Sequence, residues 1–210
     1  MVTLLLDELS FFIFIACFIL YFFLLYSGIN KKTTSKFTVF NEIYKNWVKD
    51  RLEDQNPLVG VQALRNFIMG NSTFVSALFI LLGIVVGYYT FFVTDNNNFF
   101  GIVGISIGLV QFTLLLFLIM FCLLNFILSI RYSSRLSLLI SGKPSNYSLK
   151  NIDGINVTRD TLIHAQTHWM LGIRGLFYLI VSFSWLLHPL LLIISSISIT
   201  IYLLRDHEII

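Results

Sequence analysis

Four long apolar stretches dominate the pattern of hydrophobic and polar positions along the chain. They cover about 9–26, 74–93, 99–130 and 171–204. A helix needs about 20 mostly apolar residues to cross a hydrocarbon layer about 30 Å thick. The stretches are long and lack the alternation of barrel strands, and in lipid their backbone groups must be satisfied internally. The pattern therefore predicts an all-α, polytopic integral membrane bundle with four spans, forming a single membrane domain over 1–210.

The last apolar stretch predicts a helix that is too long to cross the membrane upright. Residues 175–204 would form a helix of about 45 Å at about 1.5 Å per residue. Pro189 removes a backbone hydrogen bond and clashes with the preceding turn. One kinked, tilted helix is the first interpretation. The alternative is a split into two shorter segments hinged at Leu187-His188-Pro189, because no polar turn separates the halves.

Two polar connections, 28–72 and 131–174, separate the apolar stretches. In the first, apolar side chains recur at the three- and four-residue spacing of one helical face: Phe37, Phe40, Tyr44, Trp47, Val48 and Leu52. This spacing predicts a helix over about 37–54, and a second helix is expected over 57–69, beginning at Pro57. We expect both to be cytoplasmic interfacial helices, since the short polar connections offer little protein to cover an apolar face.

Nearly all basic residues lie in these connections. Of 14 Lys and Arg, 13 lie between Lys31 and Arg174, while the N-terminus and the turn 94–98 contain none. The positive-inside rule then places the connections, with Lys45 and Lys143, in the cytoplasm and the N-terminus and Asn96 outside. A single kinked last span would put Arg205 outside, and a hinged pair would put it inside. The expected location is the cell membrane, with several passes.

The composition excludes several classes of protein. Hydrophobic residues make up 57% of the chain and charged residues 12%, against about 25% charged in soluble domains. No basic run is interleaved with aromatic residues, so the lipid bilayer is the expected partner and nucleic acid is not. Asp7 and Glu8 precede the first apolar stretch without a basic region, which indicates a retained span rather than a signal peptide. Cys17 and Cys122 lie in apolar runs and suggest no disulfide framework.

Two groups of short motifs, which we call landmarks, follow one another at characteristic spacings along the chain. The first is Trp47-Val48, Leu64-Arg65-Asn66-Phe67-Ile68-Met69 and Ser72-Thr73-Phe74. The second is Gly172-Ile173-Arg174, Phe177-Tyr178, Trp185, His188-Pro189 and Tyr202-Leu203-Leu204-Arg205-Asp206. Over about 25–206 their order and spacing resemble the domain of unknown function 599 family. The resemblance implies a helical membrane protein and carries over no biochemical activity.

Histidines supply the candidate metal chemistry. His164 and His168 are four residues apart, which brings both rings to one helical face, as in metal-binding helices. No Glu follows His164, so a third ligand would come from Asp153, Asp160 or another loop, and two interfacial polar residues are the favoured interpretation. No cofactor is predicted, and a metal at this pair stays open as an alternative.

Other polar and small residues are also candidates for function. Arg65, Asn66 and Arg174 either reach headgroup phosphates or line a pocket for an anionic lipid or ligand. His188 is expected at membrane depth, hydrogen-bonded to Gln111 or Asn125. Close helix packing is expected at two glycine pairs, so that leucine at Gly83 or Gly104 should be more harmful than at Ser106. The pairs are Gly83 with Gly87 and Gly104 with Gly108.

Three functions follow from these features. The first is a non-catalytic structural or accessory subunit that acts through helix packing and contacts with lipid or protein, as a homo-oligomer or within a larger membrane complex. The second is a membrane enzyme or metal-binding protein that uses His164, His168 and His188. The third is a small channel or carrier, although a coupled transporter is disfavoured because no span has Asp or Glu in its central part.

Overall fold

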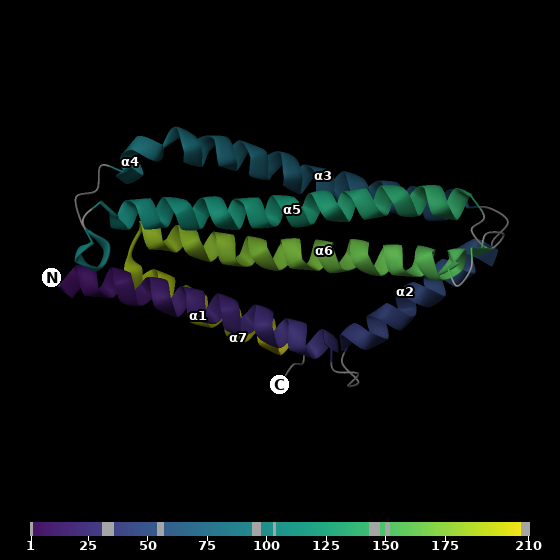
Figure 1. The fold of residues 1–210 in the computed structure, drawn as a ribbon, viewed down its shortest axis with the longest axis horizontal. Helices are drawn as coiled ribbons and strands as arrows, with labels where there is room; N and C mark the ends of the chain where they lie inside the picture. Colours follow the sequence, from purple (N-terminus) through teal and green to yellow (C-terminus); the bar gives the residue numbers. More distant parts are fainter. Residues whose placement is uncertain are drawn as a thin grey trace. The chain divides into compact units, whose positions relative to one another are not determined.

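The computed structural model describes residues 2–30, 36–53, 57–93, 98–102, 104–142, 148–149 and 152–206. Within these ranges the chain is almost entirely helical (Figure 1). The helices are α1 (Val2–Asn30), α2 (Lys36–Glu53), α3 (Leu58–Gly87), α4 (Tyr89–Val93), η1 (Phe99–Gly101), α5 (Ile107–Ser141), α6 (Gly154–Phe183), η3 (Ser184–Leu186) and α7 (Pro189–Asp206). Two strands of two residues, β1 (Ser148–Leu149) and β2 (Ile152–Asp153), pair antiparallel just before α6. The predicted all-α architecture is confirmed.

Four helical segments are long and apolar enough to cross a membrane. They are Leu5–Leu25, Leu58–Gly87, Ile107–Ser141 and Gly154–Leu186. This number agrees with the sequence prediction. The first three segments are longer than the predicted spans, and the fourth begins earlier in the chain. The third, for example, begins at Ile107, after the 3-10 turn η1, and continues to Ser141.

The helix expected over 57–69 is not a separate element, because α3 continues through it without a break. The polar residues at 71–73 were expected to end a helix, but their side chains are accommodated inside α3. The hydroxyls of Ser72 and Thr73 donate to the carbonyls of Ile68 and Met69, at 2.9 and 3.1 Å. α6 likewise begins at Gly154, inside the polar connection 131–174, and continues into the last apolar stretch.

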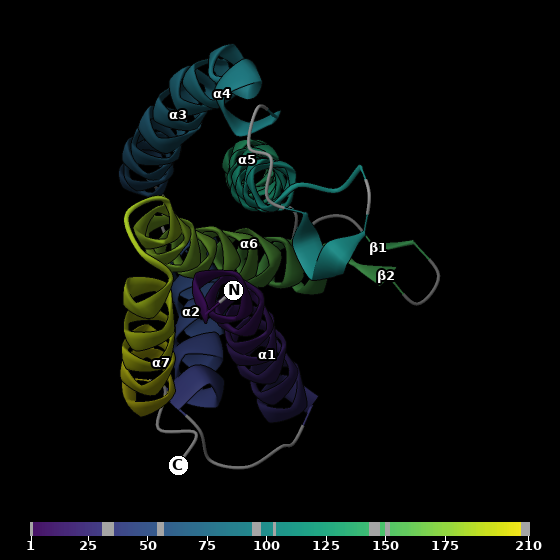
Figure 2. The same ribbon diagram turned by 90° about the vertical axis from the view of Figure 1, so that its left-hand side faces the viewer.

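The last apolar stretch is divided, so the single kinked helix is wrong and the hinged pair is right. α6 ends at Phe183, η3 makes one tight turn, and α7 begins at Pro189, which suits a first helical position. α7 then runs back along the end of α6, with ring contacts between Phe177 and Tyr202 (6.2 Å between centroids). It also packs along α1 (Figures 1 and 2).

The chain divides into two compact units. Unit 1 comprises 1–36, 79–121 and 174–210, and unit 2 comprises 37–78 and 122–173. The prediction that 1–210 form a single membrane domain stays a prediction.

Unit 1 has an aromatic interior. Phe14 and Tyr21 of α1 and Tyr178 of α6 are fully buried. Tyr178 contacts Phe14 and Phe18 edge-on, with ring centroids 5.9 and 5.1 Å apart. Edge-to-face contacts at these distances are favourable beyond the area they bury, and here they join α1 to α6.

Unit 2 has an aliphatic core that covers part of α2. Val48 is completely buried with Leu64, Leu136, Ile140 and Leu162, and Tyr44, Trp47 and Leu52 pack against this cluster. The expectation that protein offers little cover for the face of α2 is therefore wrong for this half of the helix. The cover comes from α3, α5 and α6, whose lengths the sequence analysis underestimated. Burial also raises the pKa of Tyr44.

The predicted close packing at Gly83, Gly87 and Gly104 is not found. Within the part of the chain that the structure describes, no atom lies within 4 Å of where a Cβ would stand at any of the three. Gly104 precedes α5 and has a φ of +93°, so its need for glycine is conformational. The close approach occurs instead at Gly172 of α6, where a Cβ would lie 3.0 Å from the ring of Phe126 in α5.

Candidate functional site

Polar side chains gather between the helices of unit 2 in a group that we call the polar junction. Its members are Asn71, Asn125, Ser129, Tyr132, His164 and His168. Positions 125, 129 and 132 are three and four residues apart on α5 and share one face, as do 164 and 168 on α6. The regular spacing on two continuous helices brings these side chains together.

Hydrogen bonds in the junction run from helix to helix. Asn125 Oδ1 lies 3.0 Å from His168 Nδ1. The Ser129 hydroxyl donates to the carbonyl of Ala165 (2.9 Å) and accepts from Nδ2 of Asn71, at 3.3 Å. Residues of α3, α5 and α6 are thus joined through one serine. Bonds between helices inside apolar surroundings orient the helices and satisfy groups that cannot reach water.

Tyr132 stacks on both histidines. Its ring centroid lies 5.5 Å from that of His164 and 5.6 Å from that of His168. Among the described residues, no group of three or more His, Cys, Asp and Glu stands close enough to hold a metal. The expected third ligand is therefore not found there, with Asp153 and Asp160 both inside the described ranges. The metal site stays a hypothesis that rests on the two histidines.

Two carboxylates of α1 hold the turns at one end of unit 1. Asp7 Oδ1 accepts a hydrogen bond from the indole of Trp185 (3.0 Å), and Glu8 Oε1 accepts one from the backbone N–H of Phe100, at 2.6 Å. Phe100 has a φ of 51°, an uncommon conformation for a residue other than glycine. The bond from Glu8 helps to stabilise that turn. The acidic pair therefore has a structural role that the sequence analysis did not assign.

Arg174 and Tyr178 face the interior of unit 1 from α6. Arg174 is only 4% exposed, and its guanidinium lies 5.7 Å from the centre of the Tyr21 ring, within cation–π range. The Tyr178 hydroxyl forms a 2.9 Å hydrogen bond with that of Thr200 in α7. These contacts connect three helices of the unit.

The remaining predicted residues are placed differently from expectation. Arg65 and Asn66 are exposed on α3 and line no pocket that the structure describes. His188 is exposed and accepts from the N–H of Leu190 (3.1 Å), while Asn125, its expected partner, bonds with His168. Gly108 is buried and Gln111 half-buried on α5. Lys143 and Asn96 lie outside the described residues.

An apolar cavity of about 170 Å³ opens in unit 1. Its wall includes Val85 of α3, Phe92 of α4, Leu115 of α5 and Phe183 of α6. No lining residue is charged, so the cavity suits hydrocarbon rather than a hydrated ligand.

The chain was compared with protein families, curated proteins and solved structures. The family model described as "Protein of unknown function, DUF599" matches residues 9–209. The chain belongs to this family. No curated protein and no solved structure matches it.

Several of the landmarks that carry the DUF599 resemblance contact one another or share a neighbour. Val48 and Leu64 meet in the core of unit 2. Phe74 stacks on Phe126 with centroids 5.1 Å apart, and Gly172 faces the same ring. Phe177 contacts Tyr202 in unit 1. These landmarks are therefore packing residues within the described structure.

Sequence reasoning missed Gly172, Asn71 and the pair Asp7 and Glu8. Gly172 was identified as part of a family landmark, but the pattern Gly-x-Arg does not indicate which side chain packs against the glycine. Asn71 resembled the end of a helix, since asparagine is common at caps and turns. The partners of these residues are far away in sequence, so no local pattern indicates them.

Proposed function

We propose that this DUF599 protein is a multi-pass protein of the cell membrane that acts without catalysis, as a structural or accessory component. It would work through contacts of its helices with lipid and with other membrane proteins, including further copies of itself. The observation that carries the proposal is that polar side chains of the polar junction are hydrogen-bonded between helices. Asn71, Asn125, Ser129 and His168 form bonds that join helices to one another.

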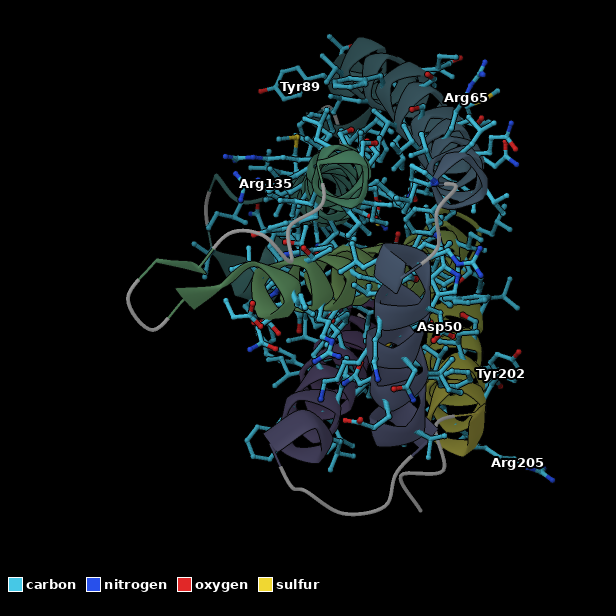
Figure 3. All side chains as sticks on the ribbon, turned by 90° about the vertical axis from the view of Figure 1, so that its right-hand side faces the viewer. Asp50, Arg65, Tyr89, Arg135, Tyr202 and Arg205 are labelled. Carbon is cyan, nitrogen blue, oxygen red and sulfur yellow. The ribbon has the colours of Figure 1, made fainter. Side chains whose placement is uncertain are left out.

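We propose the orientation that the positive-inside rule predicts, with the connections 28–72 and 131–174 in the cytoplasm and the N-terminus outside. The hairpin of α6 and α7 supports a cytoplasmic C-terminus as well. α7 is about 27 Å long at about 1.5 Å per residue, close to the thickness of hydrocarbon. Arg205, exposed at its end (Figure 3), would then reach the cytoplasmic headgroups.

The test is a native mass measurement of the full chain in detergent, with lipids and metals retained. We expect bound lipid or additional protein chains and no stoichiometric metal. A metal bound one to one, and lost on His164→Ala or His168→Ala, would overturn the proposal in favour of the metal-binding alternative.

Orientation is tested separately by cysteine labelling from outside the cell, with the native cysteines replaced. A membrane-impermeant reagent should modify position 96 and spare position 45. The opposite result would overturn the orientation.

A further inference from the structure

Helix α2 changes its surroundings half-way along its length. Val48 is buried in the core of unit 2, whereas Val39, Phe40 and Ile43 are 54, 52 and 51% exposed. At about 100° per residue the three share one side of the helix, within about 100° of one another, and Val48 lies about 180° around the axis from Val39. Phe40 stacks on Tyr44 (6.4 Å), which leaves the outer side of its ring uncovered. The C-terminal half of α2 therefore has a protein partner, whereas the N-terminal half presents large apolar side chains.

The charge of unit 2 indicates what could cover that half. Unit 1 contains five basic and five acidic residues, whereas unit 2 contains nine basic and six acidic residues. The formal net charge of +3 therefore belongs to unit 2. Arg65, Arg131 and Arg135 are exposed, and in Figure 3 Arg65 and Arg135 point away from α3 and α5.

We propose that the face formed by Val39, Phe40 and Ile43 binds the surface of an anionic lipid bilayer. The apolar side chains enter the edge of the hydrocarbon, and the basic side chains of unit 2 lie among the headgroup phosphates. The inference rests on the proposed membrane function and names one of its partners. A second copy of the chain is a poorer occupant because it would bring the same positive charge to the interface.

The positions of the basic side chains favour a headgroup layer over a single pocket for one anionic ligand. In Figure 3, Arg65 and Arg135 point to different sides of unit 2. Arginines distributed in this way suit a layer of phosphates, and they do not converge on one bound anion. In an anionic bilayer the hydrocarbon edge covers the apolar face of α2, and the headgroup phosphates neutralise the surrounding positive charge.

The experiment places an environment-sensitive dye on the full chain in lipid nanodiscs. Cys17 and Cys122 are replaced by alanine, and the dye is attached to Phe40→Cys. The control is Lys49→Cys, exposed on the same helix and about 180° around the axis from Phe40 at about 100° per residue. One set of discs contains phosphatidylcholine alone, and the other contains an equal mixture with phosphatidylglycerol.

We expect the emission at position 40 to shift to the blue, more strongly with phosphatidylglycerol, and position 49 to report water in both lipids. Salt should reduce the difference, since the screening length falls from about 10 Å at 0.1 M to about 3 Å at 1 M. Arg65→Gln, distant from α2 in sequence, should lower the preference for phosphatidylglycerol about fivefold, the effect of one basic residue near an anionic surface. Its unfolding temperature should be unchanged.

Two results would overturn the inference alone. In one, positions 40 and 49 report the same aqueous surroundings in loaded discs. In the other, the signal at position 40 follows protein concentration and ignores lipid composition, which assigns the face to a second copy. A chain that does not co-purify with the discs would instead overturn the proposed membrane function, and this inference with it.

Discussion

In unit 1 the largest buried side chains are aromatic. The ring of Tyr178 in α6 meets that of Phe14 edge to face and that of Tyr21 at a tilt, both in α1. In unit 2 an aliphatic cluster around Val48 stands beside a polar junction. Unit 1 carries no net formal charge and unit 2 carries +3. The comparison shows that one chain uses two ways to hold helices together. Ring contacts and single hydroxyl bonds do this in unit 1, and a small protein core with linked amides and histidines does it in unit 2.

The sharpest test of this difference is a charge placed in the core of unit 2. Val48→Asp removes a fully buried side chain and puts a carboxylate in its place. Burial of an unpaired charge is among the most destabilising changes, and we expect a loss of at least about 3 kcal/mol in the free energy of unfolding. Thermal unfolding in detergent measures it.

Val39→Asp is the matched control, on the same helix but exposed. We expect a change within about 0.5 kcal/mol, as for most surface substitutions. Equal losses for the two variants would mean that α2 is not divided between a covered and an uncovered half.

Glycine substitutions compare the packing of the two units directly. Gly172→Leu would force a side chain into the ring of Phe126 in unit 2, whereas Gly83→Leu in unit 1 meets open space. We expect Gly172→Leu to cost about 1–3 kcal/mol, the usual range for overpacking, and Gly83→Leu to be nearly neutral in the monomer. Thermal unfolding of monomer isolated by size-exclusion chromatography measures both. A large loss at Gly83 would instead indicate another chain packed on α3.

The smallest expected effect concerns the hydroxyl bond of unit 1. Tyr178→Phe removes its hydrogen bond to Thr200 and leaves the ring contacts in place. A bond of this kind contributes about 1 kcal/mol. A double-mutant cycle with Thr200→Val should give a coupling energy of about that size. No coupling would mean that α6 and α7 are held by apolar contacts alone.

How far the sequence predicts the fold depends on the range of the interaction. The helical architecture and the four apolar segments followed from local hydropathy, and Pro189 marked the break correctly. Helix ends were harder to predict. Gly70-Asn71-Ser72 has the composition of a turn, yet Asn71 is buried against Ser129 and α3 continues. Favourable tertiary contacts there outweigh a weak local preference.

The candidate site was less predictable than the fold. The spacing of His164 and His168 correctly indicated a shared face, because helical periodicity alone decides it. It could not indicate Tyr132 or Asn125, which come from another helix. The glycine pairs were misjudged for the same reason. A small residue permits close approach, but only the partner helix decides whether the approach occurs.

The sequence alone determined the class of this protein, because composition and apolar length set which solvent its helices require. It also determined the distribution of positive charge and the likeness to DUF599. The tertiary structure decided which half of α2 is covered, which glycine is pressed against a ring, and how Asp7 and Glu8 are used. Each of these depends on residues distant along the chain, and such contacts exist only once the helices have packed.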